Sequence, residues 1–282
     1  MRLLLLVTAM LAFAAAPLLA QPPAATLKKI TASGKFRIGY RTSLPPMSFQ
    51  DQNGQPQGYS LDICRKVAEQ VRKAAGGKIA VDYVPVTAEN RFDALLSGKI
   101  DLLCGSTTVT LKRREIVDFS QLTFVTGAAL MTRTDNYDNN FNGKKIGVVP
   151  GTTTAAELKK MLKETGVKAE VVEVKTAELG RDMLLKHQLD AFAADQVVLI
   201  GLLMTSAQGK SLSVDSNSFS FEPLALAMRR NDADFRLLVD REISRLYRSG
   251  EVLDIYQKWL GRFSRKRPIM FDALYKLNAT PE

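Results

Sequence analysis

Small hydroxyl residues and a basic cluster follow an apolar run in the first half of the chain. The run Ile100–Cys104 ends at Gly105, and Ser106-Thr107-Thr108 then leads toward Arg113. Short apolar runs bounded by turn residues are typical of buried strands, and open α/β sheets bind ligands beyond the carboxyl ends of their strands. An arginine that follows Thr108 by five residues is placed to hold a carboxylate through two parallel hydrogen bonds. The same residues also fit an ordinary Ser/Thr loop beside a solvated arginine.

Two stretches in the second half of the chain carry groups that bind charge. Asp195 follows the predicted strand Asp190–Ala194, so its carboxylate is expected at the ligand edge of a sheet. Gly151-Thr152-Thr153-Thr154 opens a predicted helix, and helix N-termini bind anions through free N–H groups and the helix dipole. No Gly-Lys-Ser/Thr follows, so this is not a phosphate-binding loop. Simple helix capping is the alternative for both stretches.

Two further arginines, Arg41 and Arg91, are predicted at or just after the carboxyl ends of strands, facing the same cleft. Each arginine taken alone fits a surface position. Together they suit a carboxylate, because a charge-assisted hydrogen bond contributes roughly 1.5–3 kcal/mol.

Metal or triad chemistry is not expected. Two separated cysteines and one histidine do not make a closed zinc site. His187 lies near a predicted helix end, where a solvated position is expected. Cys64 falls on the apolar face of a predicted helix and Cys104 ends a predicted strand, so they can form a disulfide in an exported protein. Two buried free thiols are the alternative.

Composition narrows the class of protein. The chain has 282 residues, enough for one large or two modest domains, and a formal net charge of +10. No basic run is interleaved with aromatic residues, so nucleic-acid binding is not expected. The dense basic patch Ser264–Arg267 is interpreted as a solvated tail. Capture of an anionic ligand is the simpler account of the charge.

The first residues are predicted to be a secretory signal. Arg2 precedes the apolar run Leu3–Ala16, and small residues lead to Ala20, so residues 1–20 are expected to be removed. No other segment reaches the ~20 apolar residues of a membrane span. The mature protein is therefore expected to be soluble and exported.

Hydrophobic patterns and turn residues predict alternating strands and helices. Strands are expected at 35–40, 79–86, 100–104, 144–149, 169–174 and 190–194. Helices are expected at 61–75, with Ser60 as its cap, and at 89–97, 154–165, 178–187 and from 195 onward. The alternation predicts a mainly parallel sheet with helices on its faces, and its recurrence predicts two similar lobes.

Six short stretches together resemble the bacterial periplasmic binding proteins for polar amino acids, most closely the glutamate/aspartate-binding branch of ABC uptake systems. Their order and spacing carry the resemblance over nearly the whole mature chain. The stretches are Gly39-Tyr40-Arg41, Gly58-Tyr59-Ser60, Glu89-Asn90-Arg91, Cys104-Gly105-Ser106-Thr107-Thr108, Gly151-Thr152-Thr153 and Asp190-Ala191-Phe192.

The resemblance implies an α/β fold of two lobes, the type II or Venus-flytrap periplasmic binding protein, with two hinge strands. Extended apolar segments near 124–131 and 219–228 stand where these strands would cross. Lobe 1 would comprise residues 26–126 plus 225–282, with the helices of 232–260 returning to it, and lobe 2 would comprise residues 127–224.

The resemblance also implies roles for individual residues. Arg113 would grip the α-carboxylate of the ligand, helped by the hydroxyl and N–H of Thr108, with Arg114 as the alternative. Asp195 would pair with the α-ammonium. Related binders of basic amino acids have an aspartate at the position of Arg41, so this end of the pocket would read the ligand side chain. The candidate ligand-binding residues are Arg41, Arg91, Ser106, Thr108, Arg113, Thr152, Thr153 and Asp195.

Two positions depart from the glutamate/aspartate branch. Ala88 stands where that branch can offer a serine hydroxyl, and Ala177 stands near the position of a histidine. The departures leave glutamate, aspartate and their amides as alternative ligands.

The expected function is that of a monomeric periplasmic solute-binding protein. It would bind an acidic amino acid, without a cofactor or catalysis, and deliver it to an ABC permease. One alternative is a periplasmic enzyme on the same scaffold, such as a cyclohexadienyl or arogenate dehydratase. The other is a detached sensor module, although no transmembrane segment supports it.

Overall fold

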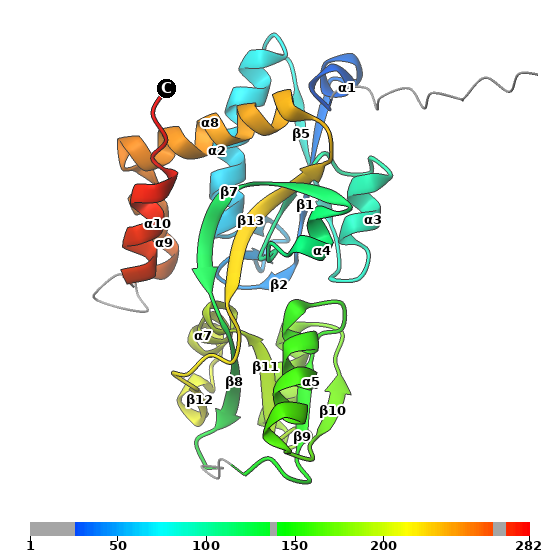
Figure 1. The fold of residues 1–282 in the computed structure, drawn as a ribbon, viewed down its shortest axis with the longest axis vertical. Coiled ribbons are helices and arrows are strands. Elements are labelled where there is room, and N and C mark those ends of the chain that lie inside the picture. Colours follow the sequence, from blue (N-terminus) through cyan, green and yellow to red (C-terminus); the bar gives the residue numbers. More distant parts are fainter. Residues whose placement is uncertain (1–25, 136–139, 262–268) are drawn as a thin grey trace, which may run out of the picture.

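The chain forms two lobes, one above the other in Figure 1, joined by long strands that run between them. This computed structural model describes residues 26–135, 140–261 and 269–282. The predicted signal peptide and the basic patch Ser264–Arg267 lie outside the described residues.

The first lobe is built on a five-stranded sheet in the order β5-β1-β6-β13-β7. Strands β5, β1 and β6 are parallel, whereas β13 runs antiparallel to both of its neighbours. Their bounds are β1 Lys35–Tyr40, β5 Ala80–Pro85, β6 Leu102–Cys104, β7 Val117–Thr126 and β13 Glu222–Arg229.

The second lobe repeats this design with the order β10-β9-β11-β8-β12. Strands β10, β9 and β11 are parallel, and β8 is antiparallel to β11 and β12. Their bounds are β8 Ala128–Arg133, β9 Lys145–Val148, β10 Glu170–Glu173, β11 Ala191–Asp195 and β12 Leu212–Val214.

The three strands expected in each lobe are parallel as predicted, but both sheets are mixed, because the crossing strands add antiparallel pairs. The chain leaves the first lobe through β7, enters the second through β8, and comes back through β13 in the opposite direction. The returning strand fits between β6 and β7 only in an antiparallel sense. Two crossing strands therefore replace helical crossovers at this side of each sheet.

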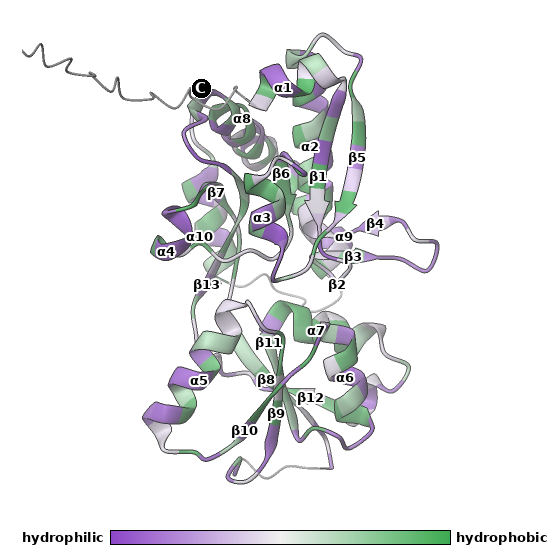
Figure 2. Ribbon diagram, turned by 90° about the vertical axis from the view of Figure 1, so that its right-hand side faces the viewer, coloured by the Kyte–Doolittle hydropathy of each residue, from purple (hydrophilic) through white to green (hydrophobic). Residues whose placement is uncertain are grey.

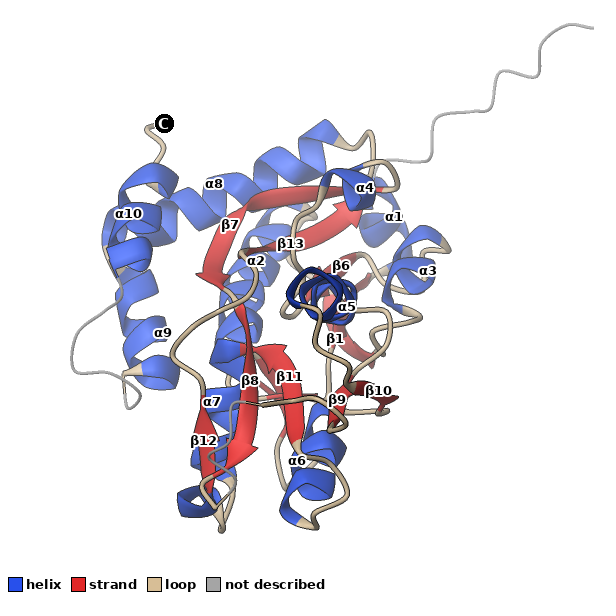
Figure 3. Ribbon diagram, turned by 60° about the horizontal axis from the view of Figure 1, so that its bottom comes forward, coloured by secondary structure: helices blue, strands red, loops and turns tan. Residues whose placement is uncertain are grey.

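Helices cover both faces of each sheet, which Figure 3 shows from below. On the first sheet α2 and α8 pack on one face and α3 on the other; on the second, α5 lies opposite α6 and α7. The helices are α1 Thr26–Ser33, α2 Tyr59–Ala74, α3 Arg91–Leu96, α4 Leu111–Arg114, α5 Thr153–Thr165, α6 Ala177–Leu185, α7 Gln196–Thr205, a 3₁₀ turn Gly209–Ser211, α8 Ala233–Ser249, α9 Glu251–Leu260 and α10 Ile269–Asn278.

Successive side chains of a strand point to opposite faces of the sheet, so the strands of the first lobe contribute to two separate hydrophobic cores. Leu102 and Cys104 of β6 pack toward α2, whereas Leu103 belongs to the core under α3. In Figure 2 the inner strands β8 and β11 are largely hydrophobic, whereas β4 and parts of β1 and β5 are hydrophilic. The sheets are thus buried on both faces, as the short apolar runs predicted.

A small three-stranded sheet stands beside the first lobe. It joins β2 Ser43–Leu44, β3 Ser48–Gln50 and β4 Pro56–Gln57, with a turn at 51–54 between its last two strands. This sheet brings Leu44 and the following Pro45-Pro46 segment toward α6 and α7 of the second lobe.

The predicted cap of α2 was wrong. The helix begins at Tyr59 after Gly58, and Ser60 lies inside its first turn. The Ser60 hydroxyl instead donates to the carbonyl of Gly105 at 3.1 Å. The Ser60 side chain therefore makes a tertiary hydrogen bond in place of the helix-capping bond that the local pattern predicted.

The disulfide between Cys64 and Cys104 is present, which confirms the expectation. It joins α2 to the carboxyl end of β6, directly before the Gly105-Ser106 loop. Residues 269–278 add a terminal helix, α10, that the sequence analysis did not predict; it packs on β7 and α8. Among the described residues, no helix is both long and apolar enough to cross a membrane.

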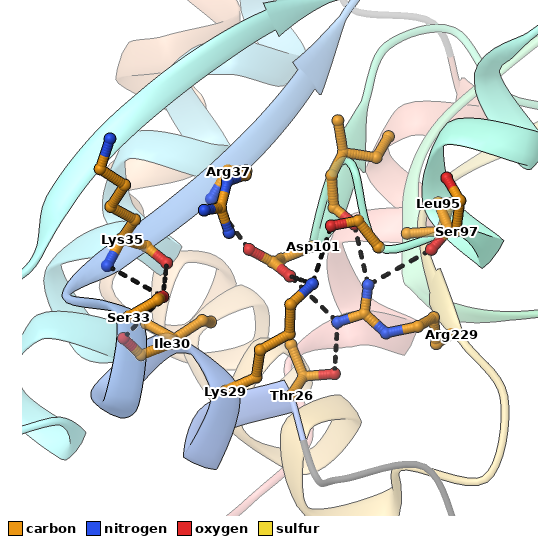
Figure 4. Close-up of polar contacts among 12 residues, drawn as sticks. Thr26, Lys29, Ile30, Ser33, Lys35, Arg37, Leu95, Ser97, Asp101 and Arg229 are labelled. Carbon is orange, nitrogen blue, oxygen red and sulfur yellow. Dashed lines mark hydrogen bonds and ion pairs between the residues drawn. The ribbon is translucent and has the colours of Figure 1, made fainter.

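A fully buried carboxylate ties together the amino ends of the first sheet (Figure 4). Asp101, at 0% exposure, accepts from the backbone N–H of Arg37 at 3.0 Å and pairs with Arg229 at 3.1 Å and Lys29 at 3.3 Å. Each of its partners comes from a different element, so this cluster fixes α1, β1 and β13 around the start of β6.

Candidate ligand-binding site

A pocket lies between the two lobes, where the carboxyl ends of β6 and β11 face each other. All eight predicted residues line it. The first lobe contributes Arg41, Arg91, Ser106, Thr108 and Arg113, and the second contributes Thr152, Thr153 and Asp195. The sequence analysis did not assign a ligand contact to the remaining lining residues, which are Leu44, Val149, Thr154, Ala177, Ala193, Ala194 and Val198.

The loop after β6 is held from several sides. The Ser48 hydroxyl donates to the carbonyl of Cys104 at 3.2 Å, and Ser60 holds Gly105 in the same way. The disulfide to Cys64 anchors the end of the strand covalently. Ser106 and Thr108 therefore enter the pocket from a preorganised backbone.

A short capped helix positions the arginine that follows this loop. The Thr110 side chain accepts from the backbone N–H of Arg113 at 3.1 Å and so caps α4. The Arg113 guanidinium reaches back into the pocket and donates to the carbonyl of Thr108 at 2.8 Å. Arg114 instead lies over the ring of Phe119 at 5.8 Å. The pocket thus contains Arg113, while Arg114 points elsewhere.

The two other arginines are buried, unlike arginines at ordinary surface positions. Arg41 is 6% exposed and Arg91 is 3% exposed. Burial lowers the pKa of Arg41 to about 10, although the charges of Asp195 and Glu178 act in the opposite direction. Burial together with the positive charges of Arg113 and Arg41 lowers the pKa of Arg91 to about 9. Both remain charged at neutral pH.

Arg91 is incompletely satisfied by the protein. Its Nη1 donates to the carbonyl of Ala88, and its Nη2 donates to the carbonyl of Gly151 in the opposite lobe at 3.0 Å. Its guanidinium also stacks over Phe92 at 4.6 Å. Its Nε is buried and has no hydrogen-bond partner within the part of the chain that the structure describes. An unpaired donor on a buried cation is costly and indicates a missing acceptor.

Asp195 occupies the N-cap position of α7, but its side chain makes no capping hydrogen bond. The carboxylate instead accepts from the hydroxyl of Ser106 across the cleft. The pKa of Asp195 is raised to about 6, chiefly by desolvation and also by the charge of Glu222, while Ser106, Arg113 and Arg41 act to lower it. This carboxylate faces the pocket and does not serve the helix.

Thr152 and Thr153 have different roles at the start of α5. The Thr152 hydroxyl accepts from the backbone N–H of Ala155 at 3.1 Å and caps the helix. The Thr153 hydroxyl points across the cleft to Thr108 at 3.1 Å. The free N–H groups of the first turn are left at the pocket, as an anion site requires.

Glu222 is the polar residue that the sequence analysis missed. It begins β13, is 1% exposed, and accepts from the hydroxyls of Thr108 at 2.5 Å and Thr153 at 2.8 Å. The one available signal was an acidic residue inside the apolar segment 219–228. Its partners lie 114 and 69 residues away, so no local spacing reveals them.

The lobes are in direct contact around this site. The pairs Ser106–Asp195, Thr108–Thr153 and Arg91–Gly151 each join the two lobes. Outside the pocket, Gly201 of α7 packs so closely on Pro45 that a Cβ would lie 2.2 Å from the proline carbonyl oxygen. The described conformation is therefore a closed one.

The two positions that depart from the glutamate/aspartate branch differ in location. Ala177 is buried and lines the pocket, whereas Ala88 borders it through its carbonyl, which accepts from Arg91. Over residues 26–135, 140–261 and 269–282, the structure contains no group of three or more His, Cys, Asp or Glu side chains that could hold a metal ion.

Comparisons with known proteins agree with this architecture. The model of the family described as bacterial extracellular solute-binding proteins, family 3, matches residues 36–262. The L-glutamate/L-aspartate-binding protein of Pseudomonas aeruginosa is 33% identical over 253 residues, covering 88% of this chain and 84% of that protein.

Two solved structures share the fold. The receptor for L-cysteine of Neisseria gonorrhoeae aligns with a TM-score of 0.76 at 24% identity, over 86% of this chain and 98% of that one. An ancestral amino-acid-binding protein, a precursor of cyclohexadienyl dehydratase, aligns with a TM-score of 0.71 at 26% identity, over 84% and 99% of the two chains. The two-lobe binding-protein fold implied by the sequence is thereby confirmed.

Proposed function

This chain belongs to the bacterial extracellular solute-binding proteins of family 3, and from that premise we propose that it captures an acidic amino acid, glutamate or aspartate, for uptake. As a class, it is a solute-binding protein of ABC amino-acid transporters. The relative from Pseudomonas aeruginosa, which is named for glutamate and aspartate, supports the finer specificity.

The observation that carries the proposal is the charge of the pocket. Three arginines, Arg41, Arg91 and Arg113, line the pocket, whereas Asp195 is the one carboxylate in the lining. Glu222 and Glu178 lie behind the lining, and their charges act on Asp195 and Arg41 respectively. Arginines therefore predominate in the lining itself, and glutamate or aspartate brings two carboxylates to them. Buried charges without a partner are costly, so an anionic ligand fits better than a neutral or cationic one.

We assign the two ends of the ligand to two groups of residues. Arg113 and the N–H groups of α5 hold the α-carboxylate, and Asp195 pairs with the α-ammonium. Arg41 and Arg91 hold the side-chain carboxylate. The unpartnered Nε of Arg91 supports this assignment, because a second carboxylate supplies the acceptor that the protein lacks.

Transport follows from hinge bending. We propose lobes of residues 26–126 plus 225–282 and of residues 127–224, which open around β7–β8 and β13 to admit the ligand. The ligand stabilises the closed state because it contacts both lobes at once. The proposed cycle takes place in the periplasm after removal of residues 1–20, with a monomer that delivers its ligand to the permease subunits.

Calorimetry and thermal unfolding with a panel of amino acids test the proposal. Glutamate or aspartate should raise the unfolding temperature and bind more tightly than glutamine, asparagine or arginine. A preference for a neutral or basic amino acid would contradict it.

An enzyme on the same scaffold is the second candidate, favoured by one observation. The pKa of Asp195, raised to about 6 by desolvation, suits a general acid in a cleft. The precursor of cyclohexadienyl dehydratase among the solved structures shares this scaffold. Incubation with prephenate and arogenate separates the candidates: a binding protein returns every added compound unchanged, whereas a dehydratase consumes its substrate.

A further inference from the structure

Glu222 stands at the point where the two crossing strands meet. It is the first residue of β13 and pairs with Thr126, the last residue of β7. Its Oε1 accepts from the hydroxyl of Ser220 at 2.6 Å, and its Oε2 accepts from Thr108 of one lobe and Thr153 of the other. One buried carboxylate thus contacts the hinge and both walls of the pocket.

The two threonine hydroxyls and Glu222 Oε2 form a closed triangle. Its sides are 2.5 Å from Thr108 to Glu222, 2.8 Å from Thr153 to Glu222 and 3.1 Å between the two threonines. Each hydroxyl has a single proton, and a carboxylate has none to give. Two protons are therefore available for three contacts, so when each hydroxyl donates within the triangle, neither has a proton left for the pocket.

The hydroxyl oxygens consequently present only lone pairs to the pocket that they line. A ligand carboxylate cannot accept a hydrogen bond from them unless a threonine hydroxyl gives up its hydrogen bond to Glu222. Hydrogen bonds to charged groups are the stronger class, so that exchange is unfavourable. An ammonium group needs only acceptors, and it also attracts the charge of Glu222.

We propose that Glu222 is a positioning residue that fixes the hydroxyls of Thr108 and Thr153 as acceptors for the ligand's α-ammonium, so that the site selects amino acids over carboxylic acids that lack the amino group. This inference rests on the proposed function, namely that an amino acid occupies the pocket. It leaves the α-carboxylate to Arg113 and the N–H groups of α5.

Charge supports the same conclusion. Asp195 also faces the pocket, and the charge of Glu222 acts on it across the site. Two carboxylates on one side of a closed pocket repel each other until a cation lies between them. The α-ammonium is the one cationic group of an acidic amino acid, so without it the repulsion between the two carboxylates is offset by protein arginines such as Arg113 alone.

The test compares glutamate with glutarate, which has the same two carboxylates and no amino group. Calorimetry of the wild type should show glutamate binding far more tightly. Glu222→Gln keeps the shape but removes the charge and gives the side chain donors of its own, which frees a hydroxyl proton for the pocket. We expect the ratio of glutamate to glutarate affinity to fall by about tenfold or more.

Glu222→Ala should reduce the ratio at least as strongly, and Glu222→Asp should restore part of it. Glu242→Gln is the matched control, because Glu242 is a buried carboxylate on α8 that pairs with Arg245 and lies outside the pocket lining. That control should leave the ratio unchanged even if it lowers the unfolding temperature.

A merely structural role of Glu222 predicts a different result. Both ligands would then weaken by the same factor in Glu222→Gln, and an unchanged ratio would overturn the proposal. If the wild type prefers a neutral amino acid, the acidic specificity fails, and the same ratio is measured for that amino acid and its analogue without the amino group. The failure of one proposal is thus distinguishable from the failure of the other.

Discussion

Two groups of buried charges lie at opposite ends of β6, and they are built differently. At the amino end, Asp101 is fully buried, and its carboxylate is paired with Arg229 and Lys29 (Figure 4). At the carboxyl end, Arg41 and Arg91 are nearly as buried, yet the Nε of Arg91 has no hydrogen-bond partner among the described residues. The charges of the first group are paired within the protein, whereas we expect a bound ligand to complete the hydrogen bonds of the second group.

The difference distinguishes buried charges that stabilise this lobe from buried charges that bind the ligand. A satisfied cluster should matter for the free energy of unfolding and leave ligand affinity alone. An unsatisfied cluster should matter for ligand affinity, and its charges should lower the stability of the ligand-free protein.

The largest expected effect is on the satisfied cluster. Asp101→Asn removes the charge that Arg229 and Lys29 share, and breaking a buried pair costs about 3–5 kcal/mol of stability. Denaturant unfolding measures the loss, and calorimetry should find unchanged affinity in the folded fraction. Asp82→Asn is the control, because Asp82 forms a surface pair with Lys35 at 3.4 Å. A stability loss no larger than the control's would remove the distinction.

Arg113→Ala should have the next largest effect, on binding alone. Truncating one partner of a buried charge pair costs about 2–5 kcal/mol, and the α-carboxylate is common to all amino acids. Every amino-acid ligand should therefore weaken by the same factor. Arg114→Ala is the matched control, since Arg114 stacks on Phe119 outside the pocket. Unchanged affinity in the Arg113 variant would refute its assignment.

Replacing an unsatisfied charge should stabilise the ligand-free protein. Among the described residues, none accepts a hydrogen bond from the Arg41 guanidinium, and burial lowers the pKa of Arg41 to about 10. Arg41→Met removes the charge and keeps the length, so the free energy of unfolding should rise on the order of 1 kcal/mol while glutamate affinity falls. A variant less stable than the wild type would place Arg41 with the satisfied cluster.

Asp195 is expected to confer a pH dependence on both stability and binding. Its pKa of about 6 lies above that of an unfolded aspartate, so the ligand-free folded state binds the proton more tightly. Stability without ligand should therefore rise as pH falls from about 6 toward about 4. Binding needs the ionised carboxylate, so affinity for glutamate and glutamine alike should fall about tenfold between pH 7 and pH 5. Asp195→Asn should abolish this dependence.

Much of this comparison was predictable from the sequence. The chain position of each apolar run places Arg41, Ser106 and Asp195 after strands, and carboxyl ends of parallel strands meet at one edge. Local patterns suffice there, because each residue depends only on the strand before it. Within each lobe, its share of the eight residues lies at one sheet edge for that reason, whereas the meeting of the two edges depends on contacts between the lobes.

The rest depends on contacts that no local pattern reports. Glu222 gains its role from Thr108 and Thr153, which strand pairing brings to it from distant parts of the chain. The position of Ser60 in the sequence predicts a helix cap, but its hydroxyl donates to the carbonyl of Gly105 instead. The mixed sheets likewise follow from the return of β13 beside β7, and the sequence of neither strand encodes the direction of the other.

The central claim is that Arg41 and Arg91 read a second carboxylate, and one calorimetric comparison tests it most directly. Wild type, Arg41→Ala and Arg91→Ala are titrated with glutamate and with glutamine. The account predicts that each variant loses about tenfold or more in affinity for glutamate, roughly 1.5–3 kcal/mol, and much less for glutamine, because only the acid presents a full negative charge. Equal losses for both ligands would contradict it and make the two arginines structural.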